Sequence, residues 1–290
     1  MSNITGTGVA LITPFNNDSS IDYNSLQKLI EHVINGGVDF LVLLGTTGEV
    51  TSISTIEKKE IIDFVVKINS KRVPLVIGIG GNNTINVKNE ILNTDLSNFS
   101  AILSVTPYYN KPSQDGLYNH YKEISKISPL PIILYNVPSR TGVNMSSDTT
   151  LRLAHDFNNI IAVKEASGDL DQIKKIIKNK PINFNVLSGD DALTLKMIYL
   201  GATGVISVIG QSNPKEFSKM VNFGLANNKA EANKIHDNLF KYYHFLYSEG
   251  NPSGIKALLF LLKICKNNLR LPLTSISNNL LNQLKLNLNK

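Results

Sequence analysis

The stretch that decides the fold is Asn159–Asp169, with the sequence NIIAVKEASGD. Ile160–Val163 is a short apolar run, which is typical of a buried strand, and Lys164 follows it directly. Burial removes water from an amine and disfavours its charged form, so the sequence predicts a partly buried lysine at a strand end. A neutral lysine amine forms Schiff bases with carbonyl substrates. On this stretch alone, a structural lysine whose ammonium reaches water is the simpler interpretation.

Length and composition favour a globular protein with a sizeable core. The chain has 290 residues, of which 42% are hydrophobic and 18% charged. This length suits two ordinary domains or a single α/β barrel. No apolar run approaches the ~20 residues that span a bilayer, and no basic segment precedes the apolar stretch near the first residue, so we expect neither a membrane partner nor a signal peptide.

The reactive and charged residue types exclude several classes of site. A single cysteine, Cys265, allows no internal disulfide and fits a reducing compartment, which predicts a cytoplasmic protein. The five histidines have no metal-ligand spacing, so we expect no metal. The net charge of +6 comes from lysines spread along the chain, without an Arg-rich stripe, so nucleic acid is not expected as a partner.

Apolar runs bounded by turn residues predict eight strands. They lie at residues 8–12, 40–44, 75–79, 101–105, 132–135, 160–163, 184–187 and 204–208. Helical patterns lie between several of them. One is capped by Asp22, and a second begins with the capping-box pair Ser54 and Glu57. Beyond residue 226 the strand pattern stops, and helices are predicted at 228–247, 255–265 and 276–288.

Strands that alternate with helices predict parallel βαβ units, and near-continuous apolar strands predict a sheet covered on both faces. Eight such units fit a (β/α)8 TIM barrel, with residues 1–225 as the barrel and 226–290 as a helical region packed on it. A doubly wound sheet is the alternative. It would normally use fewer strands and carry a dinucleotide fingerprint after the first strand, which this chain lacks.

Polar residues follow many of the predicted strands, where a barrel of this type builds its active site. Each has an ordinary structural explanation on its own, as a turn, a core aromatic or a surface arginine. Their coincidence at one rim is the stronger signal. The residues are Thr46, Thr47, Tyr108, Tyr109, Tyr135, Arg140, Lys164 and Gly189.

The motifs that carry these residues resemble the dihydrodipicolinate synthase / N-acetylneuraminate lyase family of Schiff-base aldolases. GTTGE, TPYYNKPSQ, LYNVPSRTG, VKEASGD and LSGDD occur in family order and spacing over nearly the whole chain. The segment YNVPSRTG, which contains Arg140, resembles the synthase branch. Sialic acid lyases typically carry a different sequence there.

The resemblance implies a condensation of pyruvate with L-aspartate 4-semialdehyde, on the route to diaminopimelate and lysine. It implies an imine between Lys164 and pyruvate, with no separate cofactor, and a homotetramer built as a dimer of dimers. The remaining site residues take implied roles. Thr46 and Thr47 hold the pyruvate carboxylate; Tyr135, Thr46 and Tyr109 relay protons, with Tyr109 from a neighbouring subunit; Arg140 binds the semialdehyde carboxylate; Gly189 and Ile206 offer backbone contacts to pyruvate.

Two positions depart from relatives that lysine inhibits. Val50 follows the GTTGE motif, and Asn86 stands where sensitive members typically carry a glutamate, so we expect weak or absent inhibition. Two other functions stay open at this point. One is a lyase or aldolase acting on a keto-sugar acid, and the other is a non-catalytic barrel that senses a keto acid.

Overall fold

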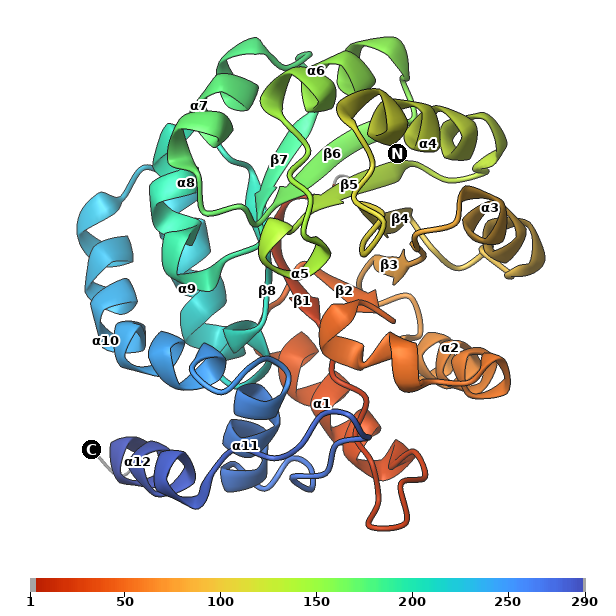
Figure 1. Ribbon diagram of the computed structural model, residues 1–290. Coiled ribbons are helices and arrows are strands. Elements are labelled where there is room, and N and C mark those ends of the chain that lie inside the picture. Colours follow the sequence, from red (N-terminus) through yellow and green to blue (C-terminus); the bar gives the residue numbers. More distant parts are fainter. Residues whose placement is uncertain (1–3, 289–290) are drawn as a thin grey trace. The chain divides into compact units, whose positions relative to one another are not determined.

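The computed structural model describes residues 4–288. Within them, eight strands form a closed barrel in sequence order (Figure 1). The strands are β1 (Gly6–Ala10), β2 (Phe40–Leu43), β3 (Leu75–Gly78), β4 (Ala101–Val105), β5 (Ile132–Asn136), β6 (Ile160–Glu165), β7 (Asn185–Ser188) and β8 (Gly204–Ser207). Helices lie between the strands, so the predicted (β/α)8 fold is confirmed.

The chain divides into two compact units. Unit 1 comprises Met1–Thr5 and Pro74–Ile206, and unit 2 comprises Gly6–Val73 and Ser207–Lys290. The predicted division at residue 225 between a barrel and a C-terminal helical region remains a prediction.

Unit 1 is built from consecutive parallel strand pairs, β3 with β4 through to β7 with β8. Its helices are α3 (Thr84–Asn93), α4 (Gln114–Ile127), α5 (Pro138–Thr141), α6 (Ser147–Asp156), α7 (Leu170–Asn179) and α8 (Thr194–Leu200). Figure 1 shows α4, α6 and α7 side by side along one side of β5, β6 and β7. Side chains on both faces of these strands are therefore buried, which explains the continuous apolar runs in the sequence.

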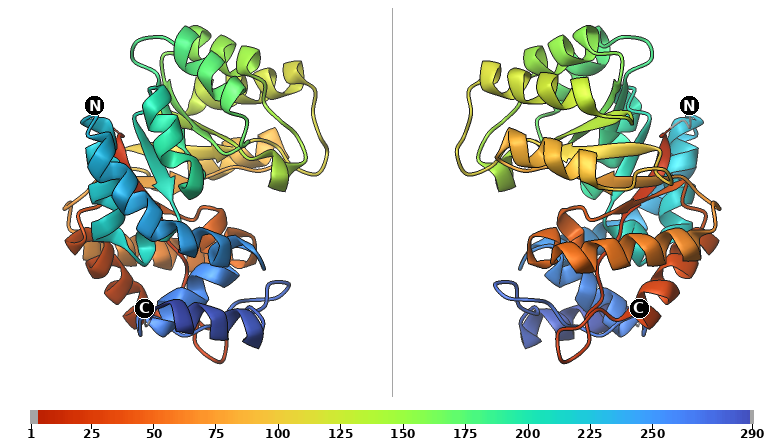
Figure 2. Two further views of the ribbon diagram at one scale, coloured as in Figure 1. Left: turned by 90° about the vertical axis from the view of Figure 1, so that its left-hand side faces the viewer. Right: turned by 90° about the vertical axis from the view of Figure 1, so that its right-hand side faces the viewer.

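Unit 2 contains β1, β2 and the helices at both ends of the chain. These are α1 (Tyr23–Asn35), α2 (Thr55–Asn69), α9 (Pro214–Leu225), α10 (Lys229–Tyr247), α11 (Ser253–Leu261) and α12 (Asn278–Leu288). The predicted caps are confirmed: Asp22 accepts from the N–H of Ser25 at the start of α1, and Ser54 and Glu57 form a capping box on α2. Figure 2 shows α10 running along α9, with α11 and α12 beside it.

The structure corrects the prediction in three places. The helix expected at 255–265 ends at Leu261, because the chain turns at Lys263, which has a positive φ of 59°. Cys265 is consequently outside a helix, although it is buried, and burial raises the pKa of its thiol to about 12. Helices α5, α6 and α9 were not predicted. The strand at 101–105 has its predicted bounds, and the other strands differ from the predicted ones by one or two residues at one or both ends.

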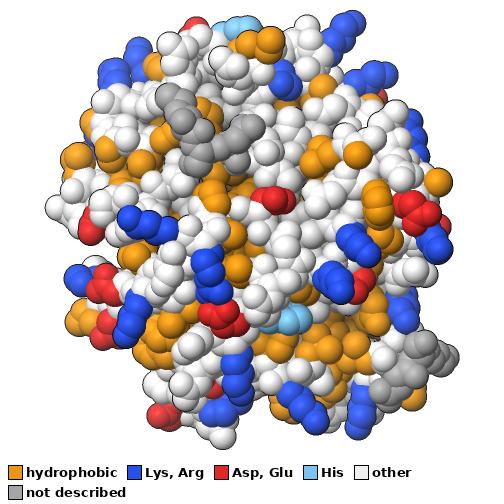
Figure 3. Space-filling view, turned by 180° about the vertical axis from the view of Figure 1, so that it is seen from behind, with side chains coloured by type: hydrophobic (Ala, Val, Ile, Leu, Met, Phe, Trp, Pro, Cys, Tyr) orange, Lys and Arg blue, Asp and Glu red, His pale blue; other side chains and the backbone are white. Residues whose placement is uncertain are grey.

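The surface carries charges of both signs. On the face drawn in Figure 3, Lys and Arg side chains are scattered among acidic ones and do not form a stripe. Among residues 4–288, no helix is both long and apolar enough to cross a membrane.

Candidate active site

The centre of the candidate site in unit 1 is Lys164 on β6. Its register partner on β5 is Tyr135, so the two side chains leave their strands on the same side. The Lys164 Nζ lies 4.2 Å from the centroid of the Tyr135 ring, within the range of a cation–π contact. Each residue is only 6% exposed. The structure therefore places the amine in a nearly dry position with an aromatic face against it.

Gly189 follows β7 and lies directly against the lysine stem. A Cβ added at Gly189 would stand 3.1 Å from the Lys164 Cε and 2.7 Å from the Cβ of Ala166. Its backbone N–H donates to the carbonyl of Glu165 at 2.8 Å, so a hydrogen bond joins Gly189 to the end of β6. Glycine is therefore the residue that leaves room for the Lys164 side chain here.

Asn136, which follows Tyr135 on β5, and Glu165, which follows Lys164 on β6, belong to a polar network that was not predicted from the sequence. Asn136 Nδ2 donates to both carboxylate oxygens of Glu165 at 3.1 Å, and Gln172 Nε2 donates to one of them at 3.1 Å. The N–H of Ser167 donates to the other at 2.8 Å. Burial raises the pKa of Glu165, and these hydrogen bonds oppose the rise. The network joins the ends of β5 and β6 beside Lys164.

Tyr109 lies on a loop of unit 1, and Arg140 lies on a short helix of the same unit. Tyr109 has a positive φ of 74°, which is uncommon for a residue with a side chain, and its N–H donates to the Thr141 carbonyl at 3.4 Å. Tyr109 is 88% exposed, whereas Tyr108 beside it is half-buried. Arg140 lies on the short helix α5 and is exposed. The remaining predicted residue of this unit, Ile206, is buried on β8.

Thr46 and Thr47 belong to unit 2, in a short 3₁₀ turn (Thr46–Gly48) after β2. Thr47 is 3% exposed, and its hydroxyl oxygen accepts a hydrogen bond of 3.0 Å from Asn251 Nδ2. Thr46 is half-buried. The turn is fastened at its end as well, because the Thr13 hydroxyl donates to the Gly48 carbonyl at 2.7 Å.

Within residues 4–288, no group of three or more potential metal-ligating side chains gathers in one place. The chemistry that the site offers is that of an amine, hydroxyl groups and a guanidinium.

A sequence model of the dihydrodipicolinate synthetase family matches residues 3–290. The chain belongs to this family. The 4-hydroxy-tetrahydrodipicolinate synthase of Flavobacterium psychrophilum is 50% identical over 286 residues, which cover 99% of this chain and 98% of that protein. The family resemblance found in the sequence motifs is therefore confirmed.

Solved structures of this family agree with the fold. The crystal structure of dihydrodipicolinate synthase from Aquifex aeolicus is 39% identical, with a TM-score of 0.95 over 99% of this chain and 97% of that one. The chloride-inhibited dihydrodipicolinate synthase from Acinetobacter baumannii, complexed with pyruvate, is 37% identical, with a TM-score of 0.95 over 99% and 98% of the two chains.

Proposed function

We propose that this member of the dihydrodipicolinate synthetase family condenses pyruvate with L-aspartate 4-semialdehyde to give 4-hydroxy-tetrahydrodipicolinate, in diaminopimelate and lysine biosynthesis. The observation that carries the proposal is the buried Lys164, with the ring of Tyr135 against its Nζ and Gly189 leaving room for its stem. The names of the relatives at about half identity support the same product, and the pyruvate complex of the Acinetobacter baumannii enzyme supports pyruvate as a substrate.

In the proposed reaction, the Lys164 amine attacks the keto carbon of pyruvate, and water leaves as the imine forms. The imine withdraws electrons, so a proton leaves the pyruvate methyl group and an enamine results. The enamine carbon then attacks the aldehyde carbon of the second substrate, which forms the new C–C bond, and the aldehyde oxygen takes up a proton to become a hydroxyl. The amino group of that substrate then attacks the imine carbon, which closes the ring and releases Lys164 as the free amine. The electron sink is the covalent imine through Lys164, so the proposed chemistry uses no separate cofactor.

The proton transfers need a hydroxyl close to the imine carbon. Tyr135 supports this role because its ring lies against the lysine Nζ. We assign to Thr46 and Tyr109 the rest of a hydroxyl relay, and to Thr46 and Thr47 the binding of the pyruvate carboxylate. A chain of hydroxyl groups passes protons better than a lone phenol, since each hydrogen bond polarises the next. Backbone groups of Gly189 and Ile206 are assigned to contacts with pyruvate.

The second substrate carries a carboxylate, and we assign its binding to Arg140. A guanidinium offers a planar fork that matches a carboxylate through two parallel hydrogen bonds. Arg140 is exposed on α5, so an incoming substrate reaches it without displacing core residues.

The proposed relay also requires a second copy of the chain. Tyr109 is held in a backbone conformation that costs of order 1–3 kcal/mol for a non-glycine residue, yet its ring is 88% exposed. A large exposed aromatic in a fixed conformation suits insertion into a neighbouring subunit. We propose a homotetramer, a dimer of dimers, that works in the cytoplasm, where the buried thiol of Cys265 stays reduced.

The test is condensation of the two substrates, coupled to a dihydrodipicolinate reductase and followed by loss of nicotinamide absorbance. We expect turnover in the wild-type protein and none in Lys164→Ala. Turnover that survives in Lys164→Ala contradicts the mechanism. Imine formation without turnover contradicts the semialdehyde as substrate and points to sugar aldehydes.

A further inference from the structure

The turn that carries Thr46 and Thr47 is held by residues from the far end of the chain. Asn251 and Lys256, which come just before and within α11, both reach it from more than two hundred residues away. These contacts lie within unit 2. None of them was identified from the sequence motifs.

The first contact sets the direction of a hydrogen bond. Asn251 is 8% exposed, and its amide nitrogen donates to the Thr47 hydroxyl oxygen at 3.0 Å. An amide NH₂ group is a donor only, so Thr47 uses a lone pair in this bond. Its own hydroxyl hydrogen stays available for an acceptor. The Thr47 hydroxyl can therefore donate its hydrogen to a carboxylate while it accepts from Asn251.

The second contact anchors the end of the turn. Glu49 is 3% exposed, has a positive φ of 55°, and its N–H donates to the Thr46 carbonyl at 3.1 Å. One carboxylate oxygen forms a buried ion pair with Lys256, and the other accepts from the Arg270 N–H at 3.1 Å. The Lys256 Nζ also donates to the Asn268 carbonyl at 2.8 Å. Every charged atom of the pair therefore has a partner.

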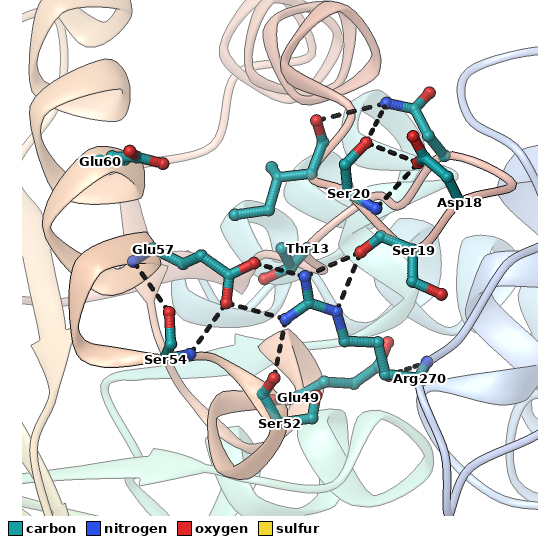
Figure 4. Close-up of polar contacts among 12 residues, drawn as sticks. Thr13, Asp18, Ser19, Ser20, Glu49, Ser52, Ser54, Glu57, Glu60 and Arg270 are labelled. Carbon is teal, nitrogen blue, oxygen red and sulfur yellow. Dashed lines mark hydrogen bonds and ion pairs between the residues drawn. The ribbon is translucent and has the colours of Figure 1, made fainter.

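Figure 4 shows how the neighbouring Arg270 side chain extends this anchor. Its guanidinium forms a two-point ion pair with Glu57, which completes the capping box of α2 with Ser54. It also donates to the backbone carbonyls of Ser52 at 2.7 Å and Ser19 at 2.7 Å. Arg270 therefore ties Ser52 and Glu57, which follow the turn, to the loop that carries Ser19.

We propose that Asn251 is a positioning residue that keeps the Thr47 hydroxyl oriented as a hydrogen-bond donor to the pyruvate carboxylate. This inference rests on the proposed function, in which Thr47 binds that carboxylate. The ion pair between Glu49 and Lys256 holds the turn in the conformation in which Asn251 reaches Thr47. Asn251 acts through Thr47 and is not itself a catalytic residue.

The variant that tests the inference is Asn251→Leu, which keeps the size of the side chain and removes the donor. We expect KM for pyruvate to rise about tenfold, the loss of one hydrogen bond to a charged group. The KM for the semialdehyde and kcat should stay close to wild type. Asn287→Leu is the matched control, because within residues 4–288 the Asn287 amide donates to the exposed Gln283 carbonyl on its own helix, and we expect wild-type kinetics.

A double-mutant cycle separates positioning from general damage. In a Thr47→Val background there is no hydroxyl to orient, so adding Asn251→Leu should not raise the pyruvate KM further. Equal rises in both backgrounds, or a wild-type pyruvate KM in Asn251→Leu, overturn the inference. If Asn251→Leu does not fold, Asn251→Ser, whose shorter side chain is a smaller change, is expected to give the same rise and the same cycle.

The two proposals fail in different ways. If wild-type protein forms no pyruvate imine at Lys164, the proposed function is wrong and the role of Asn251 falls with it. If the wild-type imine forms and the cycle is additive, the proposed function stands and only the role of Asn251 is wrong.

Discussion

Replacing Lys256 by methionine is expected to be strongly destabilising. The substitution keeps the length and apolar stem of the side chain but removes the ammonium from a side chain with no exposed surface. The Glu49 carboxylate, 1% exposed, would then keep the Arg270 N–H at 3.1 Å as its remaining partner in this contact. Burial also lowers the pKa of Lys256, while Glu49 opposes this, so each charge depends on the other.

Removing one partner of a buried ion pair costs about 3–5 kcal/mol, because the other charge stays buried without compensation. At about 2 °C per kcal/mol for a chain of this size, Tm should fall by roughly 6–10 °C. Thermal unfolding followed by circular dichroism measures this shift. The double variant Lys256→Met with Glu49→Gln should recover more than half of the loss, since no buried charge remains.

The matched control is Lys59→Met, which removes a lysine from the exposed ion pair with Asp63 on α2. Exposed pairs of this kind contribute little, so we expect an unchanged Tm. A Lys256→Met protein that unfolds within about 2 °C of wild type would show that the buried ion pair is not needed for stability, since that shift corresponds to about 1 kcal/mol. A double variant no more stable than the single one would contradict the expected recovery.

Three further predictions concern substrates, regulation and pH. Arg140→Lys should lower kcat/KM for the semialdehyde by roughly 10–100-fold, because lysine loses the two-point contact, with an unchanged pyruvate KM in steady-state kinetics. Lysine at millimolar concentration should leave the condensation rate nearly unchanged, because neither Val50 nor Asn86 offers a carboxylate to an ammonium group; a sharp fall at micromolar lysine would contradict this. Burial lowers the pKa of His120 from 6.5 to about 4. As pH falls from 6.5 to 4, the unfolded chain therefore binds a proton at this histidine that the folded chain does not bind. Stability that is present above pH 6.5 should therefore decline toward pH 4 by up to about 3 kcal/mol. In urea unfolding series, His120→Leu should remove most of that slope, and the exposed His155→Leu should keep it.

The strands were predictable because they carry a strong local signal. Each is a short run of apolar residues, and burial on both faces of a parallel sheet requires that pattern. The helices were predicted less completely than the strands. The sequence of α6 (SDTTLRLAHD) is mostly polar, so its few apolar positions do not form a clear helical pattern. Ser146, which caps the helix, was the available start signal. The Pro214 at the first position of α9 was a similar start signal.

The site residues divide in the same way. Lys164, Tyr135 and Gly189 lie at the ends of successive strands, so the fold itself predicts that they meet. Asn251 and Lys256 act through contacts with residues about two hundred positions away, and nothing in the local pattern marks them. Lys256 stands in an apolar helix, and its burial is explained by the ion pair with Glu49, which the sequence alone does not reveal.

The most direct test of the central claim is to trap the pyruvate imine with borohydride and locate it by peptide mass spectrometry. We expect one reduced adduct on the peptide that contains Lys164, and we expect it to disappear in Lys164→Ala. Lys256 is a useful internal comparison, because it is also buried but is paired with Glu49. An adduct that persists in Lys164→Ala, or that lies on Lys256 or any other lysine, would contradict the account.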